Sequence, residues 1–172
     1  MLELAARLAW RGRGGAEPNP LVGCVIERDG AIAGWGLHRR CGEGHAERLA
    51  LASAGDAARG ATAYVTLQPC NGAGRTGACT VALIEAGVRR VVFAVEDPHP
   101  KAVGGIERLR DAGIAVERVP CRAAEFVSAP FIHRVRTGLP WVTAKWAQSL
   151  DGRIATGTGE SRWISGARSR LV

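Results

Sequence analysis

Long apolar runs are absent from this sequence, and no stretch approaches the roughly 18 consecutive apolar residues that a membrane-spanning helix needs. Aromatic residues are also scarce, at 5% of the 172 residues, and the basic residues do not alternate with aromatic ones along a stripe. Proteins that bind single-stranded nucleic acid usually combine those two features. These absences argue against a membrane protein and against nucleic acid as a partner.

We expect no secretory signal in this sequence either. The opening stretch MLELAARLAWRGRGG contains no long apolar core and no signal-cleavage pattern. It carries arginine and is amphipathic, as some targeting helices are, but its apolar stripe of Leu2, Ala5, Leu8 and Ala9 also suits a helix that faces a core. We therefore expect a first helix packed on the domain, and a cytoplasmic protein.

Acidic residues are fewer than basic ones, 16 against 23, which gives a formal net charge of +7. A basic balance favours an anionic partner such as a phosphate ester. Most of the basic residues are arginines scattered along the chain, so the charge alone identifies no binding surface.

Cysteine occurs five times, and an odd number in a cytoplasmic chain argues against a disulfide framework. Cys24 lies in the apolar stretch LVGCVIE, where we expect it to behave as a small buried hydrophobe. Cys41 and Cys121 have no partner at a metal-ligand spacing, and we assign them a structural role as well. Cys70 and Cys79 remain as candidate metal ligands.

Hydrophobic periodicity and turn residues predict alternating helices and strands. Asp29-Gly30 is a strong turn signal between two apolar segments, which predicts a β-hairpin over residues 21–37. This order predicts an α/β layered domain with helices on both faces of a sheet. We expect helices over residues 1–12, 45–54, 80–87, 105–113 and 122–136, and further strands over residues 61–67, 89–96 and 114–119.

The pattern changes after the RTGLP stretch at 136–140. The segment WVTAKWAQSLDGRIATG is typical of a strand, a Leu-Asp-Gly turn and a second short strand. About thirty residues cannot bury a core of their own. We therefore predict a complete domain over residues 1–138 and the incomplete start of a second domain over residues 139–172. The alternative is a C-terminal extension packed on the first domain or on a neighbouring chain.

Three side chains from distant parts of the sequence have the chemistry of a zinc site. Zinc takes His nitrogen and Cys sulfur, and a catalytic site has three protein ligands and one open position. His45 opens a predicted helix, while Cys70 and Cys79 flank the loop between a strand and the next helix. Glu47 is then suited to moving a proton between water and a leaving nitrogen. A His-x-Glu followed later by Pro-Cys and a second Cys is the signature of zinc deaminases.

The spacing and the surrounding motifs narrow this assignment. Eight residues, NGAGRTGA, separate the two cysteines, where cytidine and tRNA-adenosine deaminases have two. With this loop, the motifs PNPLVGCVI, HAE, YVTLQPC, GRTGAC, VEDPHP and RTGLPWVTAKWAQSLDGRIAT make the chain resemble the bifunctional riboflavin-biosynthesis deaminase/reductase family. The resemblance covers the whole deaminase domain and the first strands of the reductase domain. It implies a three-layer α/β/α cytidine-deaminase-like fold with a mixed central sheet.

The resemblance also implies a reaction. This family hydrolyses the 2-amino group of 2,5-diamino-6-ribosylamino-4(3H)-pyrimidinone 5′-phosphate, releasing ammonia, with Zn²⁺ as cofactor. Water activated at the zinc site would attack C2 of the ring, and Glu47 would protonate N3 and then the departing amine. Arg75 takes the position that contacts the phosphate, a role that suits a bidentate guanidinium. The substrate-binding residues that the resemblance implies are Asn19, His38, Ala46, Arg75 and His99.

The chain departs from the family pattern at the substrate-facing loop. Gln68 stands where Glu is expected, Gly72 where His is expected, and Gly77-Ala78 where two prolines are expected. His99 replaces an Asn. Loss of a hydrogen-bonding side chain weakens discrimination between substrates, so the reaction is better defined by the sequence than the particular pyrimidine is.

Two function classes remain open beside the leading one. The chain could deaminate another base, such as a pterin, guanine or a nucleic-acid base, or it could be a non-catalytic zinc module used in assembly. Ammonia release across substrates separates the first alternative, and replacement of Glu47 separates the second. We expect at least a dimer, because strands such as WVTAKWA would expose apolar edges.

The reductase part would use NADPH, with Lys145 at its substrate site, only if that domain were complete. We therefore expect no reductase activity from these 172 residues.

Overall fold

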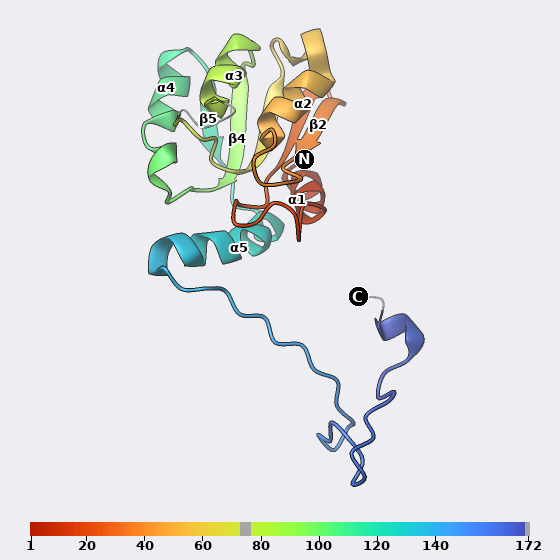
Figure 1. Cartoon of the computed structure of the whole chain (residues 1–172). Helices are drawn as coiled ribbons and strands as arrows, with labels where there is room; N and C mark the ends of the chain where they lie inside the picture. Colours follow the sequence, from red (N-terminus) through yellow and green to blue (C-terminus); the bar gives the residue numbers. More distant parts are fainter. Residues whose placement is uncertain (73–76, 171–172) are drawn as a thin grey trace. The chain divides into compact units, whose positions relative to one another are not determined.

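The computed structural model describes residues 1–72 and 77–170 of the chain (Figure 1). It divides into two compact units, Met1–Trp141 and Val142–Val172, which are considered separately below. Among the described residues, no helix has both the length and the apolar character needed to cross a membrane. The elements of the first unit are α1 (Leu2–Trp10), β1 (Gly23–Arg28), β2 (Ala31–Leu37), α2 (Ala46–Ala54), η1 (Gly55–Ala58), β3 (Thr62–Leu67), α3 (Cys79–Glu85), β4 (Arg90–Val95), η2 (Pro100–Ala102), α4 (Gly105–Asp111), β5 (Ala115–Arg118) and α5 (Arg122–Thr137).

The centre of this unit is a five-stranded sheet in the order β2-β1-β3-β4-β5. β1 pairs antiparallel with both β2 and β3, whereas β3, β4 and β5 run parallel to one another. The β1–β2 hairpin turns at Asp29 and Gly30, whose φ angles of 52° and 82° are the left-handed values that a two-residue hairpin turn requires. The predicted mixed sheet and the predicted hairpin are therefore both confirmed.

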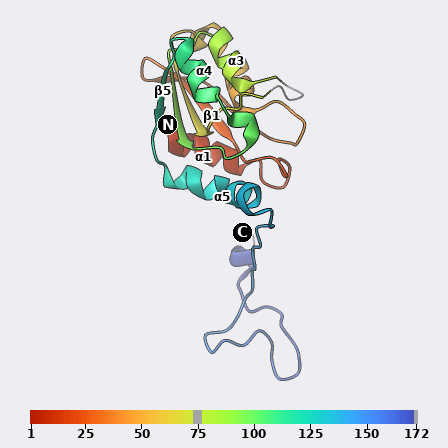
Figure 2. The same cartoon turned by 90° about the vertical axis from the view of Figure 1, so that its left-hand side faces the viewer.

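Helices cover both faces of the sheet (Figure 2). α1 and α5 pack on each other and on the central strands, while α2, α3 and α4 form a row against the opposite face. Because each helix buries one apolar stripe against the sheet, the result is three layers. The three-layer α/β/α fold predicted from the resemblance is confirmed. The predicted helices and strands lie where expected, with ends that differ by one or two residues.

Glycines let α2 lie directly on the backbone of β2. A Cβ atom on Gly36 would lie 2.3 Å from the Ala46 carbonyl oxygen, and one on Gly34 would lie 2.6 Å from the Ala50 carbonyl oxygen. No other residue type fits such distances without displacing the helix. This contact fixes the first turn of α2, which carries His45 and Glu47 to the end of the sheet.

The main hydrophobic cluster lies between the sheet and the α2–α4 layer. Val65 of β3, Val91 of β4 and Leu83 of α3 are fully buried there. Cys24 of β1 belongs to the same cluster, as expected for a small buried hydrophobe. The rigid face that results presents the C-terminal ends of β3 and β4 and the first turns of α2 and α3 to the same region.

The second unit does not contain the two strands predicted for it. Among residues 142–170 the only regular element is a short 3-10 helix, η3 (Ala167–Arg170). The predicted Leu-Asp-Gly turn is present, with the Gly152 N–H donating to the Ser149 carbonyl at 3.0 Å. The two predicted strands do not form, because a pair of short strands that has no further strand beside it and no covered face is marginally stable at best. The edge-strand argument for a dimer therefore has no support from these residues.

Candidate active site

Three potential metal ligands converge at one point of the first unit. The Nδ1 atom of His45 lies 3.2 Å from the Cys79 Sγ atom and 3.5 Å from the Cys70 Sγ atom. All three ligand atoms lie within 4.8 Å of one another. Ligands that share a tetrahedral Zn²⁺ at bond lengths of about 2.0 to 2.3 Å are separated by roughly 3.5 Å. The nitrogen–sulfur distances and the N/S/S donor set therefore fit zinc.

Each ligand comes from the end of an element that the sheet holds in place. His45 is the N-cap residue of α2, Cys79 is the first residue of α3, and Cys70 lies in the loop that follows β3. The Cys79 N–H donates to the Cys70 Sγ atom at 3.4 Å, and hydrogen bonding from Cys79 and His45 lowers the pKa of Cys70 to about 4. A thiolate at a helix N-terminus is stabilised by the amide dipoles. These hydrogen bonds therefore favour the thiolate, which is the form in which cysteine binds a metal.

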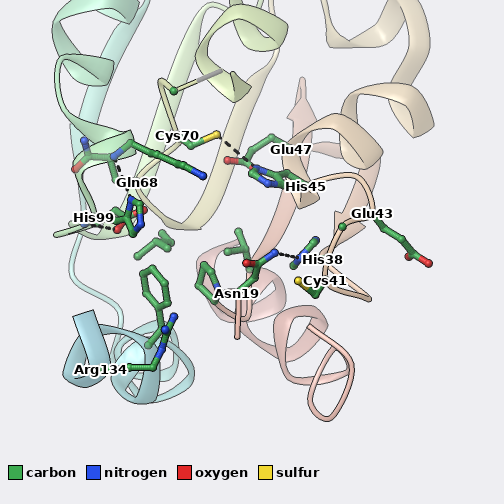
Figure 3. A pocket seen from close by; sticks show the side chains of 18 residues that line it. Asn19, His38, Cys41, Glu43, His45, Glu47, Gln68, Cys70, His99 and Arg134 are labelled. Atoms are coloured by element: carbon green, nitrogen blue, oxygen red, sulfur yellow. Dashed lines mark hydrogen bonds between the residues drawn. The ribbon is translucent and has the colours of Figure 1, made fainter. Parts of the chain in front are cut away.

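Glu47 lies in the first turn of α2, two residues beyond His45, and its side chain is buried (Figure 3). It lines the same pocket as His45 and Cys70. Burial raises the pKa of Glu47 to about 7 because the charged form is poorly solvated there. A carboxyl group that titrates near neutrality can both accept and return a proton.

The ligands open onto a cavity of about 380 Å³, a size typical of small-molecule sites. Figure 3 shows its side chains arranged around His45, with Asn19 and His38 on one side and Gln68 and His99 on the other. The lining residues are Asn19, Pro20, Val22, His38, Cys41, Gly42, Glu43, His45, Glu47, Leu67, Gln68, Cys70, Gly72, Asp97, His99, Lys101, Phe131 and Arg134.

A hydrogen-bond chain orients the amide of Asn19 in this cavity. The Nδ1 atom of buried His38 lies 3.1 Å from the Gly44 carbonyl oxygen, which can only accept, so the proton is on Nδ1. Burial lowers the pKa of His38, which favours the neutral ring. The unprotonated Nε2 atom then accepts from the Asn19 Nδ2 atom at 3.1 Å. The Oδ1 atom of Asn19 is left as an acceptor for a ligand.

The opposite wall is formed where the loop after β3 meets η2. The Asn71 side chain accepts from the Thr80 hydroxyl at 2.9 Å and donates to the Val103 carbonyl at 3.0 Å, so it joins the loop to both α3 and η2. The Gln68 side chain donates to the Ala102 carbonyl at 3.1 Å. Gln68 thus has a structural partner at the position where the resemblance leads one to expect Glu.

The structure brings together most of the residues singled out from the sequence. His45, Cys70 and Cys79 form the cluster, and Asn19, His38, Glu47 and His99 line the cavity. Ala46 does not line it, because its side chain is fully buried in the core. Arg75 lies outside the described residues, and Lys145 belongs to the second unit.

One cysteine assignment needs correction. Cys121 is buried, as its structural role predicts, but Cys41 is exposed and lines the cavity. Cys41 lies in the loop between β2 and α2, where its N–H donates to the Gly15 carbonyl at 3.0 Å and its side chain stays exposed. Spacing along the sequence could not reveal this, because exposure there depends on the path of the loop.

Sequence reasoning missed four charged residues of the cavity: Glu43, Asp97, Lys101 and Arg134. Asp97 is the first residue of the DPHP motif and Lys101 directly follows it, so this motif was a signal for both residues. Arg134 comes from α5, and its guanidinium donates to the Pro18 carbonyl at 2.7 Å. Nothing in the local sequence of α5 indicates that one of its arginines reaches the cavity.

Comparison with known proteins agrees with this geometry. The family model for the cytidine and deoxycytidylate deaminase zinc-binding region matches residues 1–95, and the model for the RibD C-terminal domain matches residues 140–172. The first of these models covers more than half of the chain and contains His45, Cys70 and Cys79.

Two curated relatives are similar over nearly the whole chain. The riboflavin biosynthesis protein RibD of Escherichia coli is 51% identical over 96% of the chain and 46% of its own length. That of Aquifex aeolicus is 46% identical over 99% of the chain and 49% of its own length. The chain thus spans about half the length of the curated relatives it matches.

Solved structures show the same arrangement. Acinetobacter baumannii RibD superposes with a TM-score of 0.86 at 47% identity, covering 98% of this chain and 48% of that one. A diaminohydroxyphosphoribosylaminopyrimidine deaminase/5-amino-6-(5-phosphoribosylamino)uracil reductase from Thermotoga maritima gives a TM-score of 0.91 at 39% identity, covering 98% and 50%. The backbone described above is therefore that of these enzymes over the matched half.

Proposed function

Because the chain belongs to the cytidine and deoxycytidylate deaminase zinc-binding family, we propose that it hydrolyses 2,5-diamino-6-ribosylamino-4(3H)-pyrimidinone 5′-phosphate to the aminouracil ribotide and ammonia. The observation that carries this proposal is the convergence of His45, Cys70 and Cys79 beside buried Glu47 at the end of a cavity. The similarity to riboflavin biosynthesis proteins supports this substrate above other bases.

His45, Cys70 and Cys79 would hold a Zn²⁺ ion, which supplies Lewis-acid activation of water when bound. Glu47 accepts a proton from the attacking water and delivers it to N3 of the ring. It then takes the proton of the hydroxyl group added at C2 and transfers it to the amino group, which leaves as ammonia while C2 becomes a carbonyl. A pKa near neutrality allows one carboxyl group to do both, and its burial keeps bulk water away from the transferred protons.

The cavity would orient the ring and the sugar phosphate. Asn19 is held by His38, so its Oδ1 atom accepts from an N–H group of the substrate. His99 and Arg134, which also line the cavity, supply donors. We also propose that Arg75 contacts the phosphate and that the backbone of Ala46, rather than its buried side chain, faces the ring.

Replacement of Glu47 by Gln tests the reaction. The variant preserves the size of the side chain but cannot transfer protons, so we expect ammonia release to fall by roughly 10²- to 10⁴-fold while zinc content per chain is unchanged. Glu85→Gln, on an exposed residue of α3, is the matched control. Ammonia release is measured on the ribotide and, in parallel, on free guanine, pterins and tRNA. Undiminished release by Glu47→Gln, or faster release from another base, would contradict the proposal.

Three further properties belong to the same proposal. We expect NADPH oxidation with the aminouracil ribotide only in a protein that carries a whole reductase domain, to whose substrate site Lys145 would belong. We expect association of copies, measurable by light scattering. A cytoplasmic location stays a prediction, which fractionation of cells can check.

A further inference from the structure

Lys101 is anchored on the wall of the cavity by its backbone. Its carbonyl oxygen accepts from the Asn71 N–H at 2.7 Å and from the Gly72 N–H at 2.8 Å, and its own N–H donates to the His99 Nδ1 atom at 3.1 Å. These bonds attach η2 to the loop that carries Cys70. The position of Lys101 relative to the metal-binding loop is therefore fixed by the main chain.

The side chain of Lys101 lies over Gly72. A Cβ atom on Gly72 would lie 3.1 Å from both the Cβ and the Cγ atoms of Lys101, which is tighter than most real contacts of this kind. The aliphatic stem thus occupies the space that a side chain at position 72 would need. The resemblance to the riboflavin-biosynthesis family leads one to expect His at this position. Gly72 therefore lacks the expected polar side chain, and the Lys101 side chain brings a different polar group to the same place.

The ammonium group of Lys101 has no protein partner among the residues that the structure describes. Within residues 1–72 and 77–170 it makes no hydrogen bond or ion pair, although Lys101 lines the cavity. Asp97, the half-buried carboxylate of this wall, accepts from the His99 N–H instead. An ammonium has three donors and no acceptor, so it requires oxygen atoms from water or from a ligand.

We propose that Lys101 is a substrate-contacting residue whose ammonium donates to an oxygen acceptor of the substrate, and that Gly72 determines specificity by making room for it. The acceptor is a carbonyl oxygen of the pyrimidine or an oxygen of the phosphate. The inference rests on the proposed function for the identity of the substrate. The stem packs on Gly72, and the side chain is exposed where it lines the cavity, so the ammonium can stay hydrated until a ligand replaces the water.

Binding to a Glu47→Gln protein measures this contact without turnover. In that zinc-loaded background, Lys101→Met preserves the length of the stem and removes the charge, and we expect the Kd of the ribotide to rise roughly 10- to 100-fold, as for a lost charged hydrogen bond. Zinc content should not change. Arg110→Met, which removes an exposed charge from α4, is the control and should leave the Kd unchanged. An unchanged Kd in Lys101→Met would overturn the inference.

The dephosphorylated riboside identifies the oxygen acceptor. If Lys101 contacts the ring, Lys101→Met weakens riboside binding by the same factor as ribotide binding. If Lys101 contacts the phosphate, the variant binds the riboside as well as the parent protein does. Either pattern supports a substrate contact, whereas equal ribotide binding by parent and variant contradicts it.

Gly72→Ala tests the pairing of the two residues. The added methyl group displaces the Lys101 stem, so we expect weaker ribotide binding, and we expect this effect to disappear when Lys101→Ala is already present. Fully additive effects of the two changes would contradict a shared site.

Amine acetylation gives a second readout in the complete chain, which contains only two lysines, Lys101 and Lys145. Mass spectrometry should show that the ribotide slows acetylation of Lys101 and leaves Lys145 unaffected. Equal acetylation of Lys101 with and without ribotide would overturn the inference.

Ribotide binding that depends on Lys101 without ammonia release would contradict the proposed function and support this contact. Ammonia release together with ribotide binding that does not depend on Lys101 would support the proposed function and contradict this contact.

Discussion

Residues 1–141 and residues 142–170 use the same kinds of apolar side chain with opposite results. In the first region Val65 and Leu83 are fully buried between the sheet and the helices. In the second region the side chains of Trp146, Leu150 and Ile154 are 67%, 108% and 65% exposed. Hydrophobic content and alternation therefore do not by themselves produce a core.

The difference comes from the number of elements that can share a face. β3 is stabilised because β1 and β4 pair with it on either side and because helices cover it above and below. The segment from Val142 onward has an alternating pattern but no second strand in the described residues to accept its backbone hydrogen bonds. A strand is thus a property of the assembled sheet, whereas the Asp29-Gly30 and Leu150-Asp151-Gly152 turns form from local residues alone.

The same leucine truncation in the two regions should give the largest contrast. Leu83→Ala opens a cavity in a closely packed core, and we expect it to lower the free energy of unfolding by about 2 to 5 kcal/mol. Leu150→Ala changes a fully exposed side chain and should stay within about 0.5 kcal/mol. Chemical denaturation of the zinc-loaded chain, followed by circular dichroism, measures both. Comparable losses would show that Leu150 is buried in solution and would break the comparison.

A glycine-to-alanine substitution should also affect stability differently in the two regions, with a smaller difference than the leucine truncation gives. Gly36→Ala forces α2 away from β2, and we expect a loss of about 1 to 3 kcal/mol from overpacking together with weaker zinc retention, because His45 moves with the helix. Gly157→Ala meets no atom within 4 Å and should be silent. Thermal melting and zinc release to a chelator measure the two effects. A stable Gly36→Ala protein with normal zinc affinity would contradict the role assigned to this contact.

The cluster of candidate metal ligands could be predicted because its chemistry is rare and the order of its residues is restrictive. His45, Cys70 and Cys79 are the right donors, and each lies at the start of a helix or just after a strand, which periodicity can locate. The hairpin was predictable for the same reason, since Asp29-Gly30 tolerates the left-handed φ angles that its turn requires.

The rest of the cavity could not be predicted, because packing between distant elements creates it. Arg134 reaches the site only because α5 lies across the end of the sheet beside Pro18. Lys101 reaches it because its backbone pairs with Asn71 and Gly72, two residues that lie far earlier in the chain. Local sequence patterns do not reveal contacts between residues that lie far apart in the chain.

Removal of the second region should have the smallest effect of all. The hydrophobic clusters of the described residues include no side chain beyond residue 132. We therefore expect a chain ending at Trp141 to unfold within about 0.5 kcal/mol of the complete one, as for a surface change. Zinc content and ammonia release per chain should also be retained. Melting curves and metal analysis of the two proteins, prepared in parallel, make the comparison. A clear loss of stability or of zinc on truncation would mean that residues 142–172 contribute to the first region, and the contrast between the two would then reflect an incomplete partner surface rather than two separate folding outcomes.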